Sequence, residues 1–141
     1  MHELLAAKNF DRDTQVLTPA YCDRSGWALL QRAFPVLDVI VSAGRDVRMR
    51  FGADNWDELP PSVELLTPDG KLWGPLPGGV FNSGPHPATG KGFVCMRGVR
   101  EYHTHPSHLG ESWASYRGQD GMNLIGILTQ LTRAWRKAYP A

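Results

Sequence analysis

The chain lacks the features that would place it in a membrane or in an oxidising compartment. It has only 2 cysteines among 141 residues, and they lie far apart in sequence, so no disulfide framework is expected. No uninterrupted apolar run is long enough to cross a bilayer, and residues 1–13 carry acidic side chains without the apolar core of a secretory signal. We therefore expect a cytoplasmic protein without a membrane partner, in which both cysteines are thiols or ligands.

Neither sign of charge is in excess. The chain has 15 Lys and Arg residues against 14 Asp and Glu residues, which gives a formal net charge of +1. Without a strong electrostatic field, no nucleic-acid partner is expected. With 42% hydrophobic and 21% charged residues in a chain of one-domain length, the composition indicates a single globular domain spanning residues 1–141.

Reactive side chains gather in one stretch, residues 86–113, which holds four of the five histidines and one of the two cysteines. Four of its side chains form the series C-x5-E-x-H-x-H: Cys95, Glu101, His103 and His105. If residues 99–105 are extended, the carboxylate and the two imidazoles point to one side of the chain. A turn at residues 97–98 then brings the thiol toward them. The other cysteine, Cys22, is interpreted as a buried or incidental thiol.

Three interpretations of this series remain open on the residues alone. The four side chains suit tetrahedral zinc, and a site closed by four protein ligands favours a structural role. Alternatively, Cys95 is a nucleophile for acyl groups, with a pKa lowered by imidazoles or by Arg97 and Arg100. In the inert interpretation, which composition alone favours, the thiol fills a short apolar strand and the histidines cap a loop.

The first third of the chain predicts helical segments. Residues 4–7 form a short apolar cluster that is expected to make a helical turn. Residues 25–34 have large apolar side chains at helical spacing, and Pro35 follows them directly. This pattern predicts a short helix that ends before the proline.

Three later stretches predict the strands of an antiparallel meander. Residues 36–42 are β-branched and apolar at both parities, which is typical of a buried strand. Residues 47–51 alternate apolar side chains with arginine, which predicts a strand with one wet face. A third strand is expected around residues 63–66, with Pro60 and Pro61 at its start because proline cannot donate a ladder hydrogen bond.

The remainder predicts a long loop and a closing helix. Residues 71–92 are rich in glycine and proline, and Trp73 and Phe81 are expected to pin this loop to the core. An apolar stripe that starts at Leu124 predicts an amphipathic helix with Asp120 as its N-cap. Together these elements predict an α+β domain: an antiparallel meander of three to four strands with flanking helices and a long loop that carries the reactive stretch.

The order of the motifs resembles the core of a ubiquitin-conjugating enzyme. In that family a Tyr-Pro-x-x-Pro-Pro strand start precedes a His-Pro-Asn motif, and the thioester-forming cysteine follows in a Gly-x-x-Cys context. The matching residues here are Leu59, Pro60 and Pro61 at the strand start, His86 and Pro87 at the His-Pro pair, and Gly92 and Cys95 at the active-site turn. Two departures stand beside the matches. Ala88 replaces the asparagine that stabilises the oxyanion, and the sequence REYHTHPSHLGES is inserted before Trp113.

The resemblance implies a fold of the ubiquitin-conjugating (UBC) type in a bacterial ubiquitin-like modification pathway, with no required cofactor. Cys95 would accept the C-terminal carboxyl of a ubiquitin-like modifier as a thioester from an activating enzyme and pass it to an amine on a target protein. His103 or His105 would act as base, and Glu101 would orient one of them.

The Cys, Glu, His, His series also resembles a predicted metal-binding family encoded beside the same bacterial pathways. It implies the alternative of a non-enzymatic accessory protein that binds zinc through Cys95, Glu101, His103 and His105. The two functions compete for one sulfur, because a zinc-bound thiolate is less available as a nucleophile. An inactive adaptor that keeps the fold is the third possibility. His108 is expected to be a loop histidine, and His86 a structural one that bonds to backbone across the loop.

Overall fold

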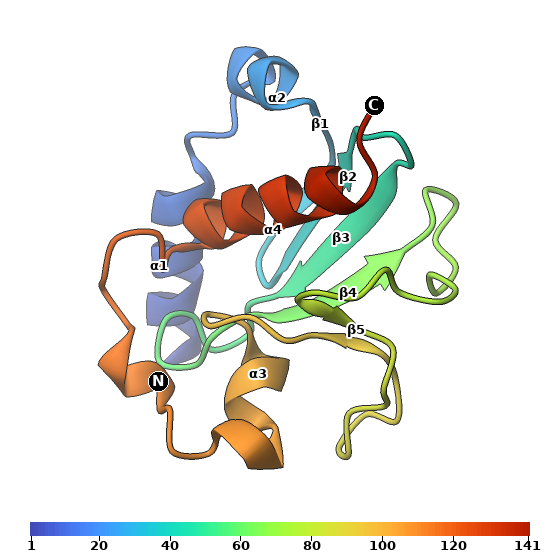
Figure 1. Cartoon of the computed structure of the whole chain (residues 1–141). Coiled ribbons are helices and arrows are strands. Elements are labelled where there is room, and N and C mark those ends of the chain that lie inside the picture. The colour runs from blue at the N-terminus through green and yellow to red at the C-terminus, as the bar shows by residue number, and fades with distance from the viewer.

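Four strands form an antiparallel meander in the order β1-β2-β3-β4 (Figure 1). The computed structural model describes residues 1–141, and its strands are β1 (Trp27–Ala33), β2 (Val36–Val41), β3 (Val47–Gly52) and β4 (Ser62–Leu66). The predicted strands at 36–42, 47–51 and 63–66 are therefore confirmed. With helices on the same domain, the predicted α+β class is confirmed as well.

The alternation in β3 gives the sheet a buried and an open face. Val47, Met49 and Phe51 are fully buried, because they point toward the core. Arg48 lies half-buried on the other face, where its side chain forms an ion pair at 2.7 Å with Asp38, whose carboxylate it covers so that Asp38 is 1% exposed. The two-residue period of the sequence is therefore the period of burial in the structure.

The predicted helix over residues 25–34 is wrong, because most of this segment forms β1. It pairs with β2 from Trp27 opposite Val41 to Ala33 opposite Val36. Except at Trp27 the strand is exposed, as expected at the edge of a sheet. A short apolar pattern is a weak signal for a helix, and ladder hydrogen bonds to β2 outweigh it.

The N-terminal residues form more helix than the predicted single turn. Helix α1 spans Glu3–Thr14 and buries Ala6, Phe10 and Thr14, which are spaced four residues apart on one face. Helix α2 spans Pro19–Ser25, where the side chain of Thr18 accepts a hydrogen bond from the amide of Tyr21. Cys22, on α2, is 6% exposed, so its prediction as a buried thiol is confirmed.

The closing helix, α4 (Leu124–Ala138), lies across one face of the sheet (Figure 1). Its N-cap is Asn123, whose side chain accepts from the amide of Gly126, so the predicted cap at Asp120 is wrong by three residues. Its buried side chains form the predicted stripe: Leu124, Ile125, Ile127, Leu128, Leu131, Thr132 and Trp135. This stripe and the inner face of the sheet share one hydrophobic core.

The segment between β4 and α4 carries the reactive stretch. It contains the two-stranded hairpin β5 (Phe81–Asn82) and β6 (Phe93–Val94), followed by α3 (Arg100–Thr104) and the short 3-10 helices η1 (Pro106–His108) and η2 (Trp113–Ser115). Phe81 is 1% exposed and Trp73 packs edge-on against Trp135, so both predicted anchors of the loop are confirmed. No helix of the structure has the length and apolarity needed to span a bilayer.

Candidate active site

Residues 99–105 are not the extended segment that the sequence predicted. Arg100–Thr104 form α3, with Val99 as N-cap and His105 as C-cap. In a helix the side chain at i+2 points away from the one at i, so Glu101 and His103 separate, while His105 lies beyond the last helical residue with an extended backbone. The helix forms because its first turn packs against β4, with the amide of Arg100 donating to the carbonyl of Pro61 at 2.8 Å.

The thiol of Cys95 lies beside an imidazole, that of His108. Cys95 directly follows β6, where its amide donates to the carbonyl of Val80 at 2.6 Å. Its Sγ is 3.5 Å from Nε2 of His108, which lies at the end of η1. Cys95 is partly exposed, whereas Cys22 is buried. Its partner, His108, was predicted to be a loop histidine.

The other nitrogen of His108 faces a carboxylate. Its Nδ1 lies 3.1 Å from Oε2 of Glu111, three residues further on. A carboxylate accepts but does not donate, so the proton of the neutral ring is on Nδ1 and Nε2 is free to accept from the thiol of Cys95. Cys95, His108 and Glu111 thus have the order of nucleophile, base and orienting acid.

Four donors hold the carboxylate of Glu111. The hydroxyl of Tyr102 donates at 2.6 Å, that of Tyr116 at 3.2 Å, and Nε of Arg97 at 3.1 Å, in addition to His108. Hydrogen bonds from Tyr102 foremost, and from Arg97, Tyr116 and His108, lower the pKa of Glu111 to about 2. The carboxylate is therefore ionised and fixed in place throughout the physiological range.

Tyr102 also fixes the plane of the imidazole. Its ring stacks on that of His108 with centroids 3.9 Å apart and an interplanar angle of 15°. Because Tyr102 is 7% exposed and lies on α3, the ring of His108 is tied to the packed part of the domain. Stacking and the hydrogen bond to Glu111 together leave the imidazole little rotational freedom.

The environment of Cys95 favours its thiol form. Burial raises the pKa of Cys95. Arg97 and Arg100, which were expected to lower it, bind carboxylates instead: Arg97 contacts Glu111 at 3.0 Å and Arg100 contacts Asp54 at 2.7 Å. A thiolate must therefore form by proton transfer to a base rather than exist beforehand.

His103, one of the two bases predicted from sequence, has both ring nitrogens occupied by backbone. Its Nε2 accepts from the amide of Gly98 at 3.0 Å, and its Nδ1 donates to the carbonyl of Glu111 at 2.7 Å. Burial lowers its pKa. His103 thus connects the loop after Cys95 to the loop that carries the carboxylate, which is a structural role.

His105, the other predicted base, points along the loop. Its Nδ1 lies 2.6 Å from the hydroxyl of Ser107, and its ring stacks on Phe93 with centroids 5.4 Å apart. The centroids of the His105 and His108 rings are 6.1 Å apart, so His105 is a neighbour of the site. The contact with the thiol belongs to His108.

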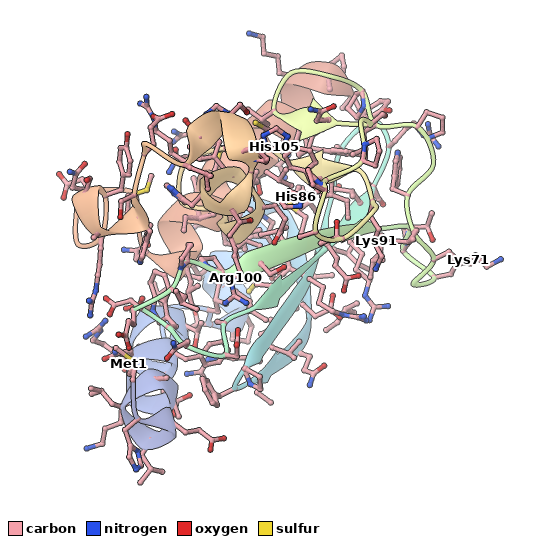
Figure 2. The ribbon with its side chains drawn as sticks, turned by 90° about the horizontal axis from the view of Figure 1, so that it is seen from below. Met1, Lys71, His86, Lys91, Arg100 and His105 are labelled. Carbon is pink, nitrogen blue, oxygen red and sulfur yellow. The ribbon has the colours of Figure 1, made fainter.

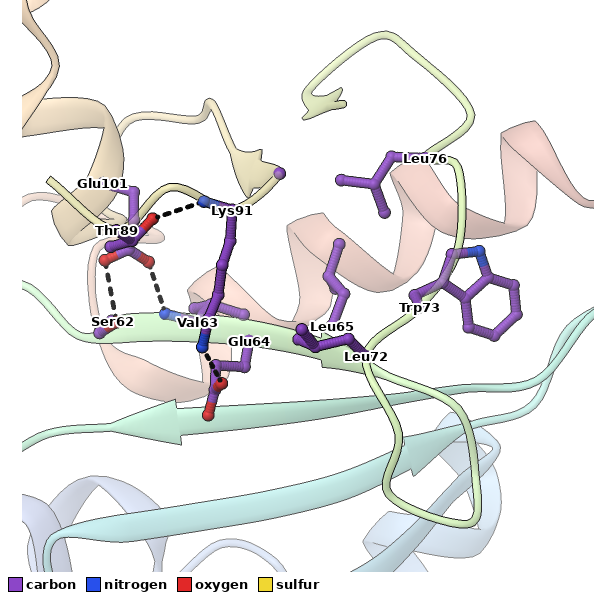
Figure 3. Close-up of a pocket in the computed structure, with 11 residues that line it drawn as sticks. Ser62, Val63, Glu64, Leu65, Leu72, Trp73, Leu76, Thr89, Lys91 and Glu101 are labelled. Atoms are coloured by element: carbon purple, nitrogen blue, oxygen red, sulfur yellow. Dashed lines mark hydrogen bonds and ion pairs between the residues drawn. The ribbon is translucent and has the colours of Figure 1, made fainter. Parts of the chain in front are cut away.

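Glu101 points to the edge of the sheet at β4 (Figure 3). Its carboxylate accepts from the hydroxyl of Ser62 and from the amide of Val63, both at 2.9 Å. Burial raises its pKa, although these two hydrogen bonds oppose the shift. The carboxylate that contacts a ring nitrogen of the histidine beside Cys95 is that of Glu111.

The four predicted zinc ligands are not arranged as a ligand set. No group of three or more His, Cys, Asp or Glu side chains lies in a metal-binding arrangement. Zinc binding by Cys95, Glu101, His103 and His105 would require Glu101 to leave β4 and His103 to leave two backbone groups. Zinc binding therefore stays a prediction that metal analysis tests.

His86 has the structural role that the sequence predicted. It is 1% exposed, and its Nε2 donates to the carbonyl of Glu101 at 3.0 Å across the loop, while its Nδ1 accepts from the amide of Ala88. Figure 2 shows His86 beside His105, and their ring centroids are 5.7 Å apart. Since the amide of Ala88 is already bonded, it does not replace the missing oxyanion donor.

Sequence reasoning missed His108 and Glu111. Their spacing of three residues was a signal, because such a pair meets on one side of a turn, and the turn after η1, in which the amide of Glu111 donates to the carbonyl of His108, places it there. The extended conformation assumed for residues 99–105 obscured it. With that segment helical, the chain returns toward Cys95 only after the turn at Pro106.

Comparison with known proteins places the site inside a region shared with other chains. Residues 85–138 match the model of the Y4jH family, described as Y4jH-like. A stretch of 41 residues is 44% identical to the uncharacterized protein y4jH of Sinorhizobium fredii, and covers 29% of this chain and 20% of that protein. The chain thus matches about a fifth of the length of this relative. The family match contains Cys95, His108 and Glu111.

Proposed function

We propose that the protein is a carrier of the ubiquitin-conjugating type, which takes a ubiquitin-like modifier as a thioester on Cys95 and passes it to an amine. The observation that carries this proposal is the contact of Sγ of Cys95 with Nε2 of His108 at 3.5 Å, with Glu111 on the other nitrogen. The four-stranded meander and the structural His86 support it, because both agree with the expectations from the motif order.

In the loading step His108 acts as general base. Its Nε2 takes the proton of the Cys95 thiol as the sulfur attacks the thioester carbonyl of the modifier on the activating enzyme. The negative charge of Glu111 stabilises the imidazolium that forms on His108, as the acid of a nucleophile-base-acid triad does. A new C–S bond forms on Cys95, the C–S bond to the activating enzyme breaks, and the leaving thiolate takes the proton from the imidazolium, so that His108 is neutral again.

In the discharge step the same base serves the acceptor. An amine attacks the thioester on Cys95, its proton passes to His108, the C–N bond forms and the C–S bond breaks with the sulfur of Cys95 as leaving group. Because burial favours the thiol form of Cys95, the leaving sulfur recovers a proton from His108. The site then returns to its starting state.

The test uses the purified protein with its cognate activating enzyme, the modifier and ATP. We expect an adduct that reducing agent removes, and we expect Cys95→Ser to abolish it or to replace it with an oxyester that resists reducing agent. Cys22→Ser is the matched control and should load normally, since Cys22 is buried on α2. Normal conjugation by Cys95→Ser would overturn the proposal.

The alternative function, a zinc-binding accessory protein, is tested in the same mixture. Zinc on Cys95 would hold the sulfur as a ligand, so chelator would speed adduct formation. The carrier function predicts an equal rate with and without chelator. Near-stoichiometric zinc in the purified protein, with adduct formation that speeds up as chelator removes the zinc, would favour the alternative.

A further inference from the structure

A cavity lies along the outer edge of β4, apart from the contacts of Cys95 (Figure 3). Its volume is about 210 Å³. Its floor is the strand itself, and its walls come from the loops at residues 72–76 and 89–92 and from Glu101 of α3. Cavities that hold cofactors or drug-sized ligands measure roughly 300–1,000 Å³, so this one suits a shorter group.

The edge of β4 is covered at both ends of the cavity. At one end the amide of Val63 donates to the carboxylate of Glu101 at 2.9 Å. At the other end the amide of Trp73 donates to the carbonyl of Leu65 at 3.1 Å. The carboxylate of Glu101 and the amide of Trp73 therefore occupy positions where a fifth strand would otherwise bond to β4.

Two backbone groups remain open between these covers. In an antiparallel pair the amide and the carbonyl of one residue face the same neighbour, so the carbonyl of Val63 and the amide of Leu65 also face outward. None of the turn and loop hydrogen bonds of the protein reaches either group. An acceptor and a donor thus face the cavity on the two sides of a single residue, Glu64.

A parallel strand would bond both open groups. In a parallel ladder the amide of one residue donates to the carbonyl of the residue before its partner, and its carbonyl accepts from the amide of the residue after its partner. One residue of a parallel segment opposite Glu64 therefore satisfies both Val63 and Leu65. Antiparallel pairing directly opposite Val63 or Leu65 is blocked, because one of the two backbone groups of each residue is already bonded. Antiparallel pairing opposite Glu64 would need two partner residues, one to donate to Val63 and one to accept from Leu65, so a parallel segment is the shorter complement for this small cavity.

The walls of the cavity are apolar on the buried side. Figure 3 shows Leu65 pointing toward Leu76, with Leu72 and Trp73 beside them. Leu72 is 55% exposed at the mouth. Side chains alternate along a strand. The peptide residue that follows the one opposite Glu64 therefore shares the face of Leu65, and its side chain enters this apolar space.

The charges of the cavity are already matched among themselves. Lys91 reaches across the mouth to Glu64, with Nζ and Oε2 3.5 Å apart. The carboxyl of Glu101 is bonded to Ser62 and Val63. A charged side chain would meet no free counter-ion here, so the chemistry favours an uncharged one.

We propose that this cavity binds an extended peptide segment of a partner protein, added parallel to β4 with an uncharged apolar side chain between Leu65 and Leu76. Strand addition of this kind takes affinity from main-chain hydrogen bonds and specificity from alternate side-chain pockets. The site does not involve Cys95, so it goes beyond the carrier function and can fail or hold independently of it.

The first measurement is amide hydrogen exchange of the full chain alone. The amide of Leu65 should exchange quickly although its residue is 7% exposed, whereas the amides of β3 should be protected. Protection of Leu65 in dilute protein would overturn the proposal. Protection that rises with protein concentration would name a second copy of the chain as the occupant, and would overturn it as well.

The second measurement uses defined probes, the blocked peptides Ac-Ser-Val-X-Val-Ser-NH2 with X as Gly, Ala, Leu, Phe or Asp, titrated to millimolar concentration. The amide resonance of Leu65 should shift with the apolar members and least with Asp. N-methylation of the valine that precedes X, which would lie opposite Glu64, should abolish the shift, because it removes the amide that donates to the carbonyl of Val63. A panel in which no member shifts Leu65, or in which the methylated peptide binds equally, contradicts the proposal.

Three variants separate this site from the catalytic one. Leu76→Ser should weaken the best peptide about tenfold, since it removes an apolar wall. The matched control, Leu30→Ser, alters an exposed leucine on β1 and should leave binding unchanged. Cys95→Ala should bind the peptide like the natural chain, and equal binding by Leu76→Ser and Leu30→Ser would contradict the proposed wall.

Discussion

Two regions of the reactive stretch are each built around a glutamate, and they treat the carboxylate in opposite ways. Glu101, on α3, is 7% exposed and joins the edge of β4, and burial raises its pKa. Glu111, ten residues later, is held by Tyr102 and other donors that lower its pKa to about 2. Glu101 joins α3 to β4 through hydrogen bonds, whereas Glu111 places a negative charge beside His108.

The difference teaches that the number and kind of donors, rather than position in the sequence, assign the role. Glu101 receives one hydroxyl and one amide hydrogen bond in a buried seam. Glu111 receives hydroxyl, guanidinium and imidazole donors at a site open to solvent. A stable negative charge can stabilise an imidazolium, and only Glu111 supplies it next to Cys95.

The largest effect is expected from removing the base beside Glu111. His108→Ala should slow loading of Cys95 by roughly 10²–10⁴-fold, the usual contribution of a general base. His105→Ala is the matched control, because His105 contacts Ser107 and not the thiol. The measurement is the rate of adduct formation under single-turnover conditions. A slower rate for His105→Ala than for His108→Ala would return the base assignment to the residue predicted from sequence.

Removing the charge of Glu111 should have a smaller effect on the same reaction. Glu111→Gln keeps the size of the side chain, and we expect loading to slow, though less than in His108→Ala, because the imidazolium of His108 loses its counter-charge. Iodoacetamide labelling of Cys95 should also require a higher pH. Tyr116→Phe removes one donor to Glu111 and should shift the pH dependence of labelling less than Glu111→Gln does. An unchanged profile in Glu111→Gln would show that Glu111 only supports the loop.

At Glu101 the expected effect is on stability and not on loading. Glu101→Ala leaves the buried amide of Val63 without an acceptor, which should lower the free energy of unfolding by about 1–3 kcal/mol. Glu101→Gln retains an acceptor oxygen and should lose less. Urea unfolding of the three proteins measures both differences. Loading by Glu101→Gln that is as slow as that of His108→Ala would instead place Glu101 in the reaction.

The smallest effect, and the one that contrasts the two glutamates directly, is the pH dependence of stability. Glu101 binds its proton more tightly when folded, so its contribution to stability falls as pH rises from its ordinary pKa of 4.5 toward the raised value. Glu111 binds its proton less tightly when folded, so its contribution is lost as pH falls from 4.5 to about 2. Urea titrations of Glu101→Gln and Glu111→Gln against the natural chain should therefore differ in opposite directions. Equal slopes would contradict the assigned environments.

Much of the fold could be predicted from local patterns. The alternation at residues 47–51 and the apolar stripe of α4 each report burial with the period of the element that carries them. The error at residues 25–34 arose because this edge segment buries only Trp27 and so has no strand period to detect. Its conformation depends on β2, its partner in the hairpin.

The candidate site was predicted less well than the fold. The sequence singled out Cys95 as the side chain to explain, and in the structure its Sγ lies beside an imidazole, that of His108. Its partners were assigned by assuming that residues 99–105 are extended, and that assumption failed where α3 packs against β4. A five-residue helix is too short to leave a periodic signal.

The sequence by itself determined the α+β class, the meander, the closing helix and the gathering of histidines with a cysteine in residues 86–113. These features follow from composition and local period, which act over a few residues. Only the tertiary structure decided that Glu101 meets Val63, 38 positions earlier, and that Glu111 and His108 meet Cys95. The physical reason is that a short helix turns each side chain toward whatever surface packs against it, and that surface comes from distant parts of the chain.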